Sequence, residues 1–251
     1  MALGMLLCAS GCTAQSPQGQ GAGVQSSLTS VGGGPIMREH VPARIADLPL
    51  RDQDGHEVSL QDLEGKFVVL APELTLCQET CPMTSANMHR AALDEVRSGT
   101  DRDVVFVEMT VDPWRDTTAR LHAYERLFGA LPDWSLLTGT PRVVKQLWEK
   151  LGVSMKKVYG DDKVTDWMTG KTLPHPYDVR HQDLVYILDP SGTIRWIRLA
   201  QPDARKAGPL PPAMRAFLSE GGVKNLHSPE LDSWTASDVE KALTYLRQQA
   251  S

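Results

Sequence analysis

Two cysteines and a proline, in the order Cys77-Gln-Glu-Thr-Cys81-Pro82, constrain the fold of this chain more than any other feature. The run before them, residues 66–70, is apolar and β-branched like a buried central strand, and residues 82–96 have the apolar spacing of a helix. The cysteines therefore lie where a strand passes into a helix, because proline is favoured at the first helical position. The unpaired N–H groups and the dipole of a helix start lower a thiol pKa, and the thiolate is both a nucleophile and a ligand for soft metals.

Strand-like and helix-like patterns alternate after this junction. Residues 103–111 and 134–137 have the apolar runs of buried strands, and each is followed by apolar residues at helical spacing, at 121–128 and 144–151. Strand, helix, strand and helix in this order predict a βαβ core with parallel strands. We therefore expect an α/β protein.

Turn signals predict a hairpin on each side of this core. An Asp-Gly pair lies within the apolar alternation of residues 48–60, and a Pro-Ser-Gly turn separates apolar runs at residues 184–188 and 193–199. Both patterns are typical of two antiparallel strands joined by a tight turn.

Three stretches beyond the core are less regular. Residues 156–180 are polar and lack periodicity, which predicts a long loop, and loops of this length are usually functional or mobile. Residues 202–233 are punctuated by Pro and Gly, with one short amphipathic piece at 214–218. A capping pattern at Thr235 to Asp238 then predicts a final helix.

The N-terminus has the pattern of an exported, membrane-anchored protein. Residues 1–12 are apolar and then small, and they resemble a bacterial lipoprotein signal, in which the last cysteine, here Cys12, receives the lipid. Residues 13–36 carry no charge and are rich in Gln, Ser and Gly, which predicts a flexible tether that spans roughly 25 Å. The folded domain is expected over residues 37–251, held at the outer face of the bacterial cytoplasmic membrane.

The other two cysteines admit three roles. Because they lie four residues apart at a helix start, Cys77 and Cys81 can point at one soft metal ion. The same pair could instead perform thiol–disulfide exchange. The third role is a structural disulfide, but closing so small a loop stabilises by only about 2 kcal/mol. His89 lies about 12 Å farther along the helix and cannot share an ion with Cys81.

The motifs taken together resemble the Sco/SenC family over residues 45–200. They are the hairpin ahead of the core, Cys77-x-x-x-Cys81-Pro82, the run Val111-Asp-Pro-x-Arg-Asp-Thr117, and His181 followed closely by Val-Tyr-Ile-Leu-Asp-Pro-x-Gly. Members of this family bind copper and assist assembly of the binuclear copper site of cytochrome c oxidase. The resemblance implies a thioredoxin-like three-layer sandwich with a central mixed β-sheet and an N-terminal β-hairpin.

The resemblance also implies the ligands. Cys77, Cys81 and His181 would bind one copper ion, and two thiolates with one imidazole suit Cu(I) while also accommodating Cu(II) or Zn(II). His175, in the long loop, is the competing histidine. Family members commonly have an aspartate before the histidine, where this chain has Arg180, and an aromatic residue and a glycine ahead of the first cysteine, where it has Ala-Pro-Glu-Leu. A cation beside the imidazole favours the neutral ring.

The function implied is that of a copper chaperone, which delivers copper to cytochrome c oxidase subunit II and is tethered to the membrane by its lipid. The alternative is a membrane-anchored thiol–disulfide oxidoreductase that uses Cys77 and Cys81. We expect Asp112, Arg115 and Asp116 to cap N–H groups and to pair locally instead of acting as catalytic acid and base. The net charge of −5 gives no reason to expect a nucleic-acid partner.

Overall fold

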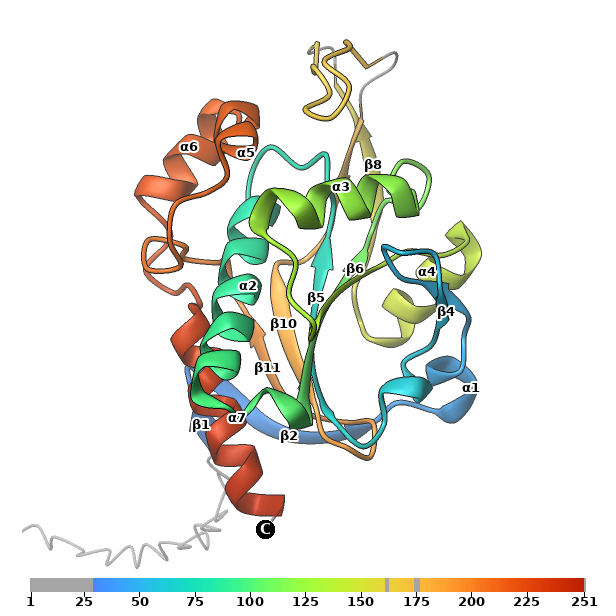
Figure 1. Ribbon diagram of the computed structural model, residues 1–251, viewed down its shortest axis with the longest axis vertical. Coiled ribbons are helices and arrows are strands. Elements are labelled where there is room, and N and C mark those ends of the chain that lie inside the picture. Colours follow the sequence, from blue (N-terminus) through green and yellow to red (C-terminus); the bar gives the residue numbers. More distant parts are fainter. Residues whose placement is uncertain (1–28, 161–162, 174–176, 251) are drawn as a thin grey trace, which may run out of the picture.

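The computed structural model describes residues 29–160, 163–173 and 177–250. A seven-stranded mixed sheet lies at its centre (Figure 1), with the strands in the order β1-β2-β11-β10-β5-β6-β7. Its strands are β1 (Ser30–Val31), β2 (Gly34–His40), β5 (Phe67–Glu73), β6 (Val104–Thr110), β7 (Trp134–Leu137), β10 (Leu184–Leu188) and β11 (Thr193–Leu199). Strands β5, β6 and β7 are parallel, as the βαβ pattern predicted, whereas β10 pairs antiparallel with β5.

Helices cover both faces of the sheet and complete a three-layer sandwich (Figure 1). One layer contains α2 (Cys81–Ser98), α3 (Thr118–Phe128) and α7 (Ala236–Ala250), and the other contains α1 (Ala43–Ala46) and α4 (Pro141–Lys150). Short 3-10 turns, η1 (Gln61–Leu63) and η2 (Asp101–Asp103), precede β5 and β6. The predicted α/β sandwich with a central mixed sheet is confirmed.

Strands β5 and β6 position the cysteine loop. Every residue of both strands is buried, because helices cover the sheet on each side, and this explains their continuous apolar runs. Their register pairs Phe67 with Val104 and Glu73 with Thr110. The carboxyl ends of the two strands therefore meet at one edge of the sheet, where the chain turns toward α2.

Both predicted hairpins form. The first consists of β3 (Leu50–Arg51) and β4 (Glu57–Val58), and its turn uses Gly55 at φ 88°, a backbone conformation that glycine adopts without strain. The second consists of β10 and β11, which pair antiparallel. The final helix is also confirmed, with Thr235 donating to the Asp238 carboxylate from its backbone N–H at 3.0 Å and its hydroxyl at 2.8 Å.

The tether predicted over residues 13–36 is wrong at its C-terminal end. Strands β1 and β2 occupy residues 30–40, and β2 pairs antiparallel with β11. Backbone pairing with β11 and the packing of Ile36 and Met37 against the core hold this segment, and Trp196 Nε1 donates to Val31 O at 2.7 Å. The signal segment, Cys12 and the start of the tether lie outside the described residues.

The long loop predicted over residues 156–180 contains a hairpin. Strand β8 (Lys156–Tyr159) pairs antiparallel with β9 (Tyr177–Arg180). The sequence shows no apolar periodicity there because ring and cation contacts hold the strands together: the Tyr159 and Tyr177 rings are 5.8 Å apart, and Lys157 Nζ lies 4.3 Å from the Tyr177 centroid. His175, the competing ligand, lies outside the described residues.

Two further helices, α5 (Pro212–Phe217) and α6 (Glu220–His227), fold within the irregular C-terminal stretch. They lie beside the N-terminal end of α2 (Figure 1). The sequence predicted only the amphipathic piece that became α5. None of the helices in the described parts of the chain combines the length and the apolar character that a membrane span requires.

Candidate metal centre

The cysteine motif lies at the strand-to-helix junction that the sequence predicted. Strand β5 ends at Glu73, and α2 begins at Cys81 with Pro82 in its first turn. Both Cys77 and Cys81 are buried, free thiols. The backbone N–H of Glu79 donates to Cys77 Sγ at 3.4 Å, so the loop itself solvates the first sulfur.

The imidazole of His181 lies beside the second sulfur. Its Nε2 is 3.7 Å from Cys81 Sγ, although the two residues are 100 positions apart in the chain. Its Nδ1 lies 2.9 Å from the carbonyl oxygen of Gln182. Because a carbonyl only accepts, Nδ1 carries the hydrogen in the neutral ring, and the lone pair of Nε2 faces the sulfur.

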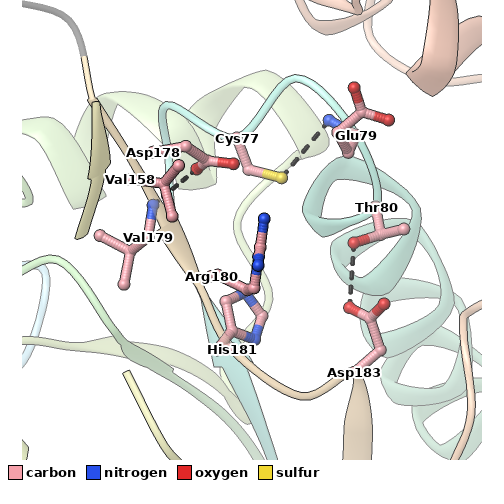
Figure 2. Close-up of a pocket in the computed structure, with 9 residues that line it drawn as sticks. All are labelled: Cys77, Glu79, Thr80, Val158, Asp178, Val179, Arg180, His181 and Asp183. Carbon is pink, nitrogen blue, oxygen red and sulfur yellow. Dashed lines mark hydrogen bonds between the residues drawn. The ribbon is translucent and has the colours of Figure 1, made fainter. Parts of the chain in front are cut away.

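A cavity of about 200 Å³ opens beside Cys77 and His181 (Figure 2). Glu79 and Thr80 line it from the cysteine loop, whereas Arg180 and Asp183 line it from the other side. Arg180, an exposed residue, and His181 both line this space (Figure 2). The structure therefore brings the predicted residues Cys77, Cys81 and His181 to one place, and their role as ligands stays a prediction.

The electrostatic environment of Cys81 differs from the one expected at a helix start. Burial raises the pKa of the Cys81 thiol well above its usual value, and the nearby Cys77 and Glu73 raise it further. The sequence predicted a lowered pKa. The helix dipole contributes at most about 2 kcal/mol, which is about 1.5 pKa units. Full burial shifts a pKa by up to about 3 to 5 units. Burial is therefore the larger effect, and the metal-free site holds Cys81 as a neutral thiol.

Two buried carboxyl groups, Glu73 of β5 and Glu108 of β6, lie beside Ser85 of α2. The Ser85 hydroxyl is 2.6 Å from Glu108 Oε2 and 3.2 Å from Glu73 Oε2, and Trp134 Nε1 donates to Glu108 Oε1 at 2.8 Å. Burial raises the pKa of Glu108 to about 7. Burial also raises the pKa of Glu73, and the neighbouring Glu108 raises it further. No sequence pattern indicates this pair, although Glu73 lies in the run that departs from the family pattern.

An acidic residue does accompany the imidazole, but it follows the histidine. Asp183 accepts a hydrogen bond from Thr80 Oγ1 at 2.9 Å, which ties the start of β10 to the cysteine loop. Burial raises the pKa of Asp183, and a positive charge on His181 opposes this shift. The acidic residue beside the imidazole is therefore Asp183, which follows the histidine, whereas Arg180 precedes it.

The acidic motif before α3 makes structural contacts: the predicted local pairing of Arg115 forms, whereas the carboxylates accept mainly from side-chain hydroxyl groups instead of the predicted N–H groups. Asp112 pairs with Arg115 and accepts the Tyr177 hydroxyl at 2.8 Å. Asp116 accepts the hydroxyl groups of Thr75 at 2.5 Å and of Thr110 at 2.6 Å. Asp116 therefore connects the cysteine loop to the end of β6 through hydrogen bonds, and Asp112 connects the motif to β9.

Comparisons with known proteins give a consistent result. A family model described as SCO1/SenC matches residues 41–207. The Arabidopsis thaliana "Protein SCO1 homolog 1, mitochondrial" is 30% identical over 141 residues, which cover 56% of this chain and 37% of that protein. A "Putative copper-binding protein" of Stutzerimonas stutzeri is 27% identical over 154 residues, which cover 60% of this chain and 67% of the relative. The match to "SCO2-like protein RC0895" of Rickettsia conorii covers 64% of that relative, so the chain spans about one third to two thirds of these relatives.

A solved structure shows the same fold. Apo Sco1 of Thermus thermophilus superposes with a TM-score of 0.52 at 21% identity, covering 76% of this chain and 95% of the other. At this identity the likeness concerns the fold alone.

Proposed function

The chain belongs to the SCO1/SenC family, and on this basis we propose that it binds one copper ion through Cys77, Cys81 and His181. We further propose that it passes the ion to the binuclear copper site of cytochrome c oxidase subunit II. Support for the cargo comes from the family and from the Stutzerimonas relative, whose name describes a copper-binding protein.

One observation carries the proposal. The ring nitrogen that faces Cys81 Sγ, at 3.7 Å, is the one left free because the other nitrogen is held by the Gln182 carbonyl. Two sulfurs and one imidazole nitrogen form the donor set that Cu(I) prefers. The hydrogen bond to Gln182 also fixes the ring orientation, as the outer partners of metal-binding histidines commonly do.

The residues of the site then have distinct tasks. Cys81 must release the proton that burial keeps on its sulfur before that sulfur can bind copper. The cavity beside Cys77 and His181 leaves room for a ligand from the acceptor to enter and compete for the ion. Delivery in this scheme is an exchange of ligands, and no catalytic turnover is required.

We also propose that the chain is held at the outer face of the bacterial cytoplasmic membrane by a lipid on Cys12. This part rests on the sequence of residues 1–12 alone.

Copper titration tests the proposal. Reduced protein should retain Cu(I) against a competing chelator, whereas Cys77→Ser, Cys81→Ser and His181→Ala should each weaken retention by at least about 100-fold, since loss of even an outer partner costs about 10- to 100-fold. His122→Ala, which removes a half-exposed surface imidazole, is the matched control. Wild-type affinity in the His181 variant would refute the ligand set. Transfer is tested by mixing the loaded protein with the copper-binding domain of subunit II and measuring where the metal resides.

A thiol–disulfide oxidoreductase is the second candidate function. It is favoured by two free thiols at a helix start, the arrangement that thiol–disulfide exchange uses. The same variants separate the two functions. His181→Ala should spare the reduction of a disulfide substrate while removing copper retention, whereas Cys77→Ser should abolish both.

A further inference from the structure

The helices α5 and α6 lie beyond residues 41–207, the part of the chain that the family model matches. A separate apolar cluster beside the first turns of α2 includes Leu226 of α6, whereas the buried residues of α5 belong to the main core. Met83 and Ala86 of α2 contribute to this cluster, together with Ala204 and Leu210. The C-terminal stretch is therefore docked beside the helix start that carries Cys81.

Its polar contacts converge on the two residues that follow Cys77. Gln78 Nε2 donates to the Phe217 carbonyl at 2.8 Å, and the Ser219 backbone N–H donates to the Gln78 carbonyl at 3.0 Å. The Ser219 hydroxyl donates to the Glu79 carboxylate, which also accepts from Asn225 Nδ2 at 3.4 Å. The backbone and the side chains of the loop between the cysteines are therefore both held by α5, by α6 and by Ser219, one of the two residues between these helices.

Close approach of α6 to this loop depends on two glycines. A Cβ at Gly222 would lie 2.1 Å from the backbone oxygen of Gln78, and a Cβ at Gly221 would lie 2.6 Å from Glu79 Oε2. Glycine in a helix interior costs about 1 kcal/mol relative to alanine. The contact with the loop gives a physical reason for both glycines.

The loop is also held on its other side. Thr80 donates to Asp183 at 2.9 Å. The backbone N–H of Glu79 donates to Cys77 Sγ, while its carboxylate accepts from the Ser219 hydroxyl. We propose that α5 and α6 are the positioning element of the metal site: they hold Gln78 and Glu79 so that the two sulfurs are ordered before the ion arrives. This inference rests on the proposed copper binding.

Ordering the loop in advance raises affinity, because binding then does not have to restrict it. The backbone entropy of one or two residues corresponds to about 10- to 100-fold in a dissociation constant. Release of α6 from the loop should therefore weaken Cu(I) binding by about this factor without removing any ligand.

Gly222→Ala is the test, because its Cβ displaces α6 from Gln78 while alanine favours the helix itself. Val223→Ala, at a partly exposed position of the same helix, is the matched control. Amide hydrogen exchange of the reduced, metal-free protein should become faster over residues 77–81 in Gly222→Ala and remain unchanged in the control. Cu(I) affinity from chelator competition should fall about 10- to 100-fold in Gly222→Ala alone.

A second pair of variants covers the case in which Gly222→Ala unfolds, which far-UV circular dichroism would reveal. Glu79→Ala removes the acceptor of Ser219 and Asn225 and should reproduce the weaker binding, whereas Glu79→Gln keeps an acceptor oxygen and should restore it. Unchanged exchange in the loop, or faster exchange with wild-type affinity, would overturn the positioning role. Failure of the wild-type protein to bind copper would overturn the proposed function, whereas the exchange measurement would still report whether α6 orders the loop.

Discussion

The buried carboxyl pair of Glu73 and Glu108 predicts that the reduced, metal-free protein loses stability as the pH rises. The pKa of Glu108 is about 7 instead of 4.5, because burial disfavours the charged form. Between these two values the folded protein keeps a proton that the unfolded chain has released. Each increase in pH therefore favours unfolding.

The size of the effect follows from the two pKa values. A pKa that rises from 4.5 to about 7 corresponds to roughly 3 kcal/mol at about 1.4 kcal/mol per pKa unit. A smaller part is already lost at pH 5, so about 2 to 3 kcal/mol disappear from the free energy of unfolding between pH 5 and pH 8. Glu108→Gln cannot titrate, yet its amide keeps an oxygen for Trp134 Nε1 and places an N–H group near Ser85 Oγ.

Urea denaturation followed by tryptophan fluorescence, with reductant and chelator present, measures this difference at each pH. The free energy of unfolding of the wild-type protein should fall by about 2 to 3 kcal/mol more than that of Glu108→Gln from pH 5 to pH 8. Glu149→Gln, which changes the same chemical group at a largely exposed position of α4, is the control. Parallel pH profiles for the wild type and Glu108→Gln would refute the raised pKa of Glu108.

Two further predictions concern charges near the site. Arg120→Ala should lower the free energy of unfolding by about 3 to 5 kcal/mol, because it leaves the carboxylate of Asp166, 4% exposed, without its bidentate partner, and chemical denaturation measures this loss. Arg180→Asn should strengthen Cu(I) retention by about 3- to 10-fold at low salt and less at high salt, because it removes a cation from the lining of the cavity beside the proposed ligands. Arg97→Gln, near the far end of α2, should leave chelator competition unchanged, and equal effects of the two arginine variants would contradict a local role of Arg180.

The sequence predicted the parts of the fold that depend on local pattern. The apolar runs of β5 and β6, the Asp-Gly turn and the Cys81-Pro82 helix start each have a signature within a few residues. The parallel core followed from their order along the chain. The partnership of Cys81 with His181 came from the family resemblance, because no local pattern relates residues 100 positions apart.

Other features could not be predicted because they depend on which strands become neighbours. Glu73 and Glu108 look like polar interruptions in two apolar runs, and only the pairing of β5 with β6 brings them to the same Ser85 hydroxyl. The direction of the Cys81 pKa also needed the fold, since it depends on the depth of burial. The hairpin of β8 and β9 was missed because aromatic rings and a lysine hold it in place of an apolar stripe.

Burial of the site gives its stability and its metal affinity opposite dependences on pH. The raised pKa of Glu108 favours the folded, metal-free protein at low pH, whereas the raised pKa of Cys81 means that protons compete with copper most strongly under the same conditions. If the protein binds copper as proposed, the empty protein is expected to become less stable as the pH rises, while copper is expected to bind more tightly. A ligand that binds only the folded state stabilises it by an amount that grows with the logarithm of the free ligand concentration divided by the dissociation constant. Because this ratio rises with pH, bound copper should add most stability at high pH, where the metal-free protein has lost most. The loaded protein is therefore expected to have a flatter pH profile of stability than the empty one.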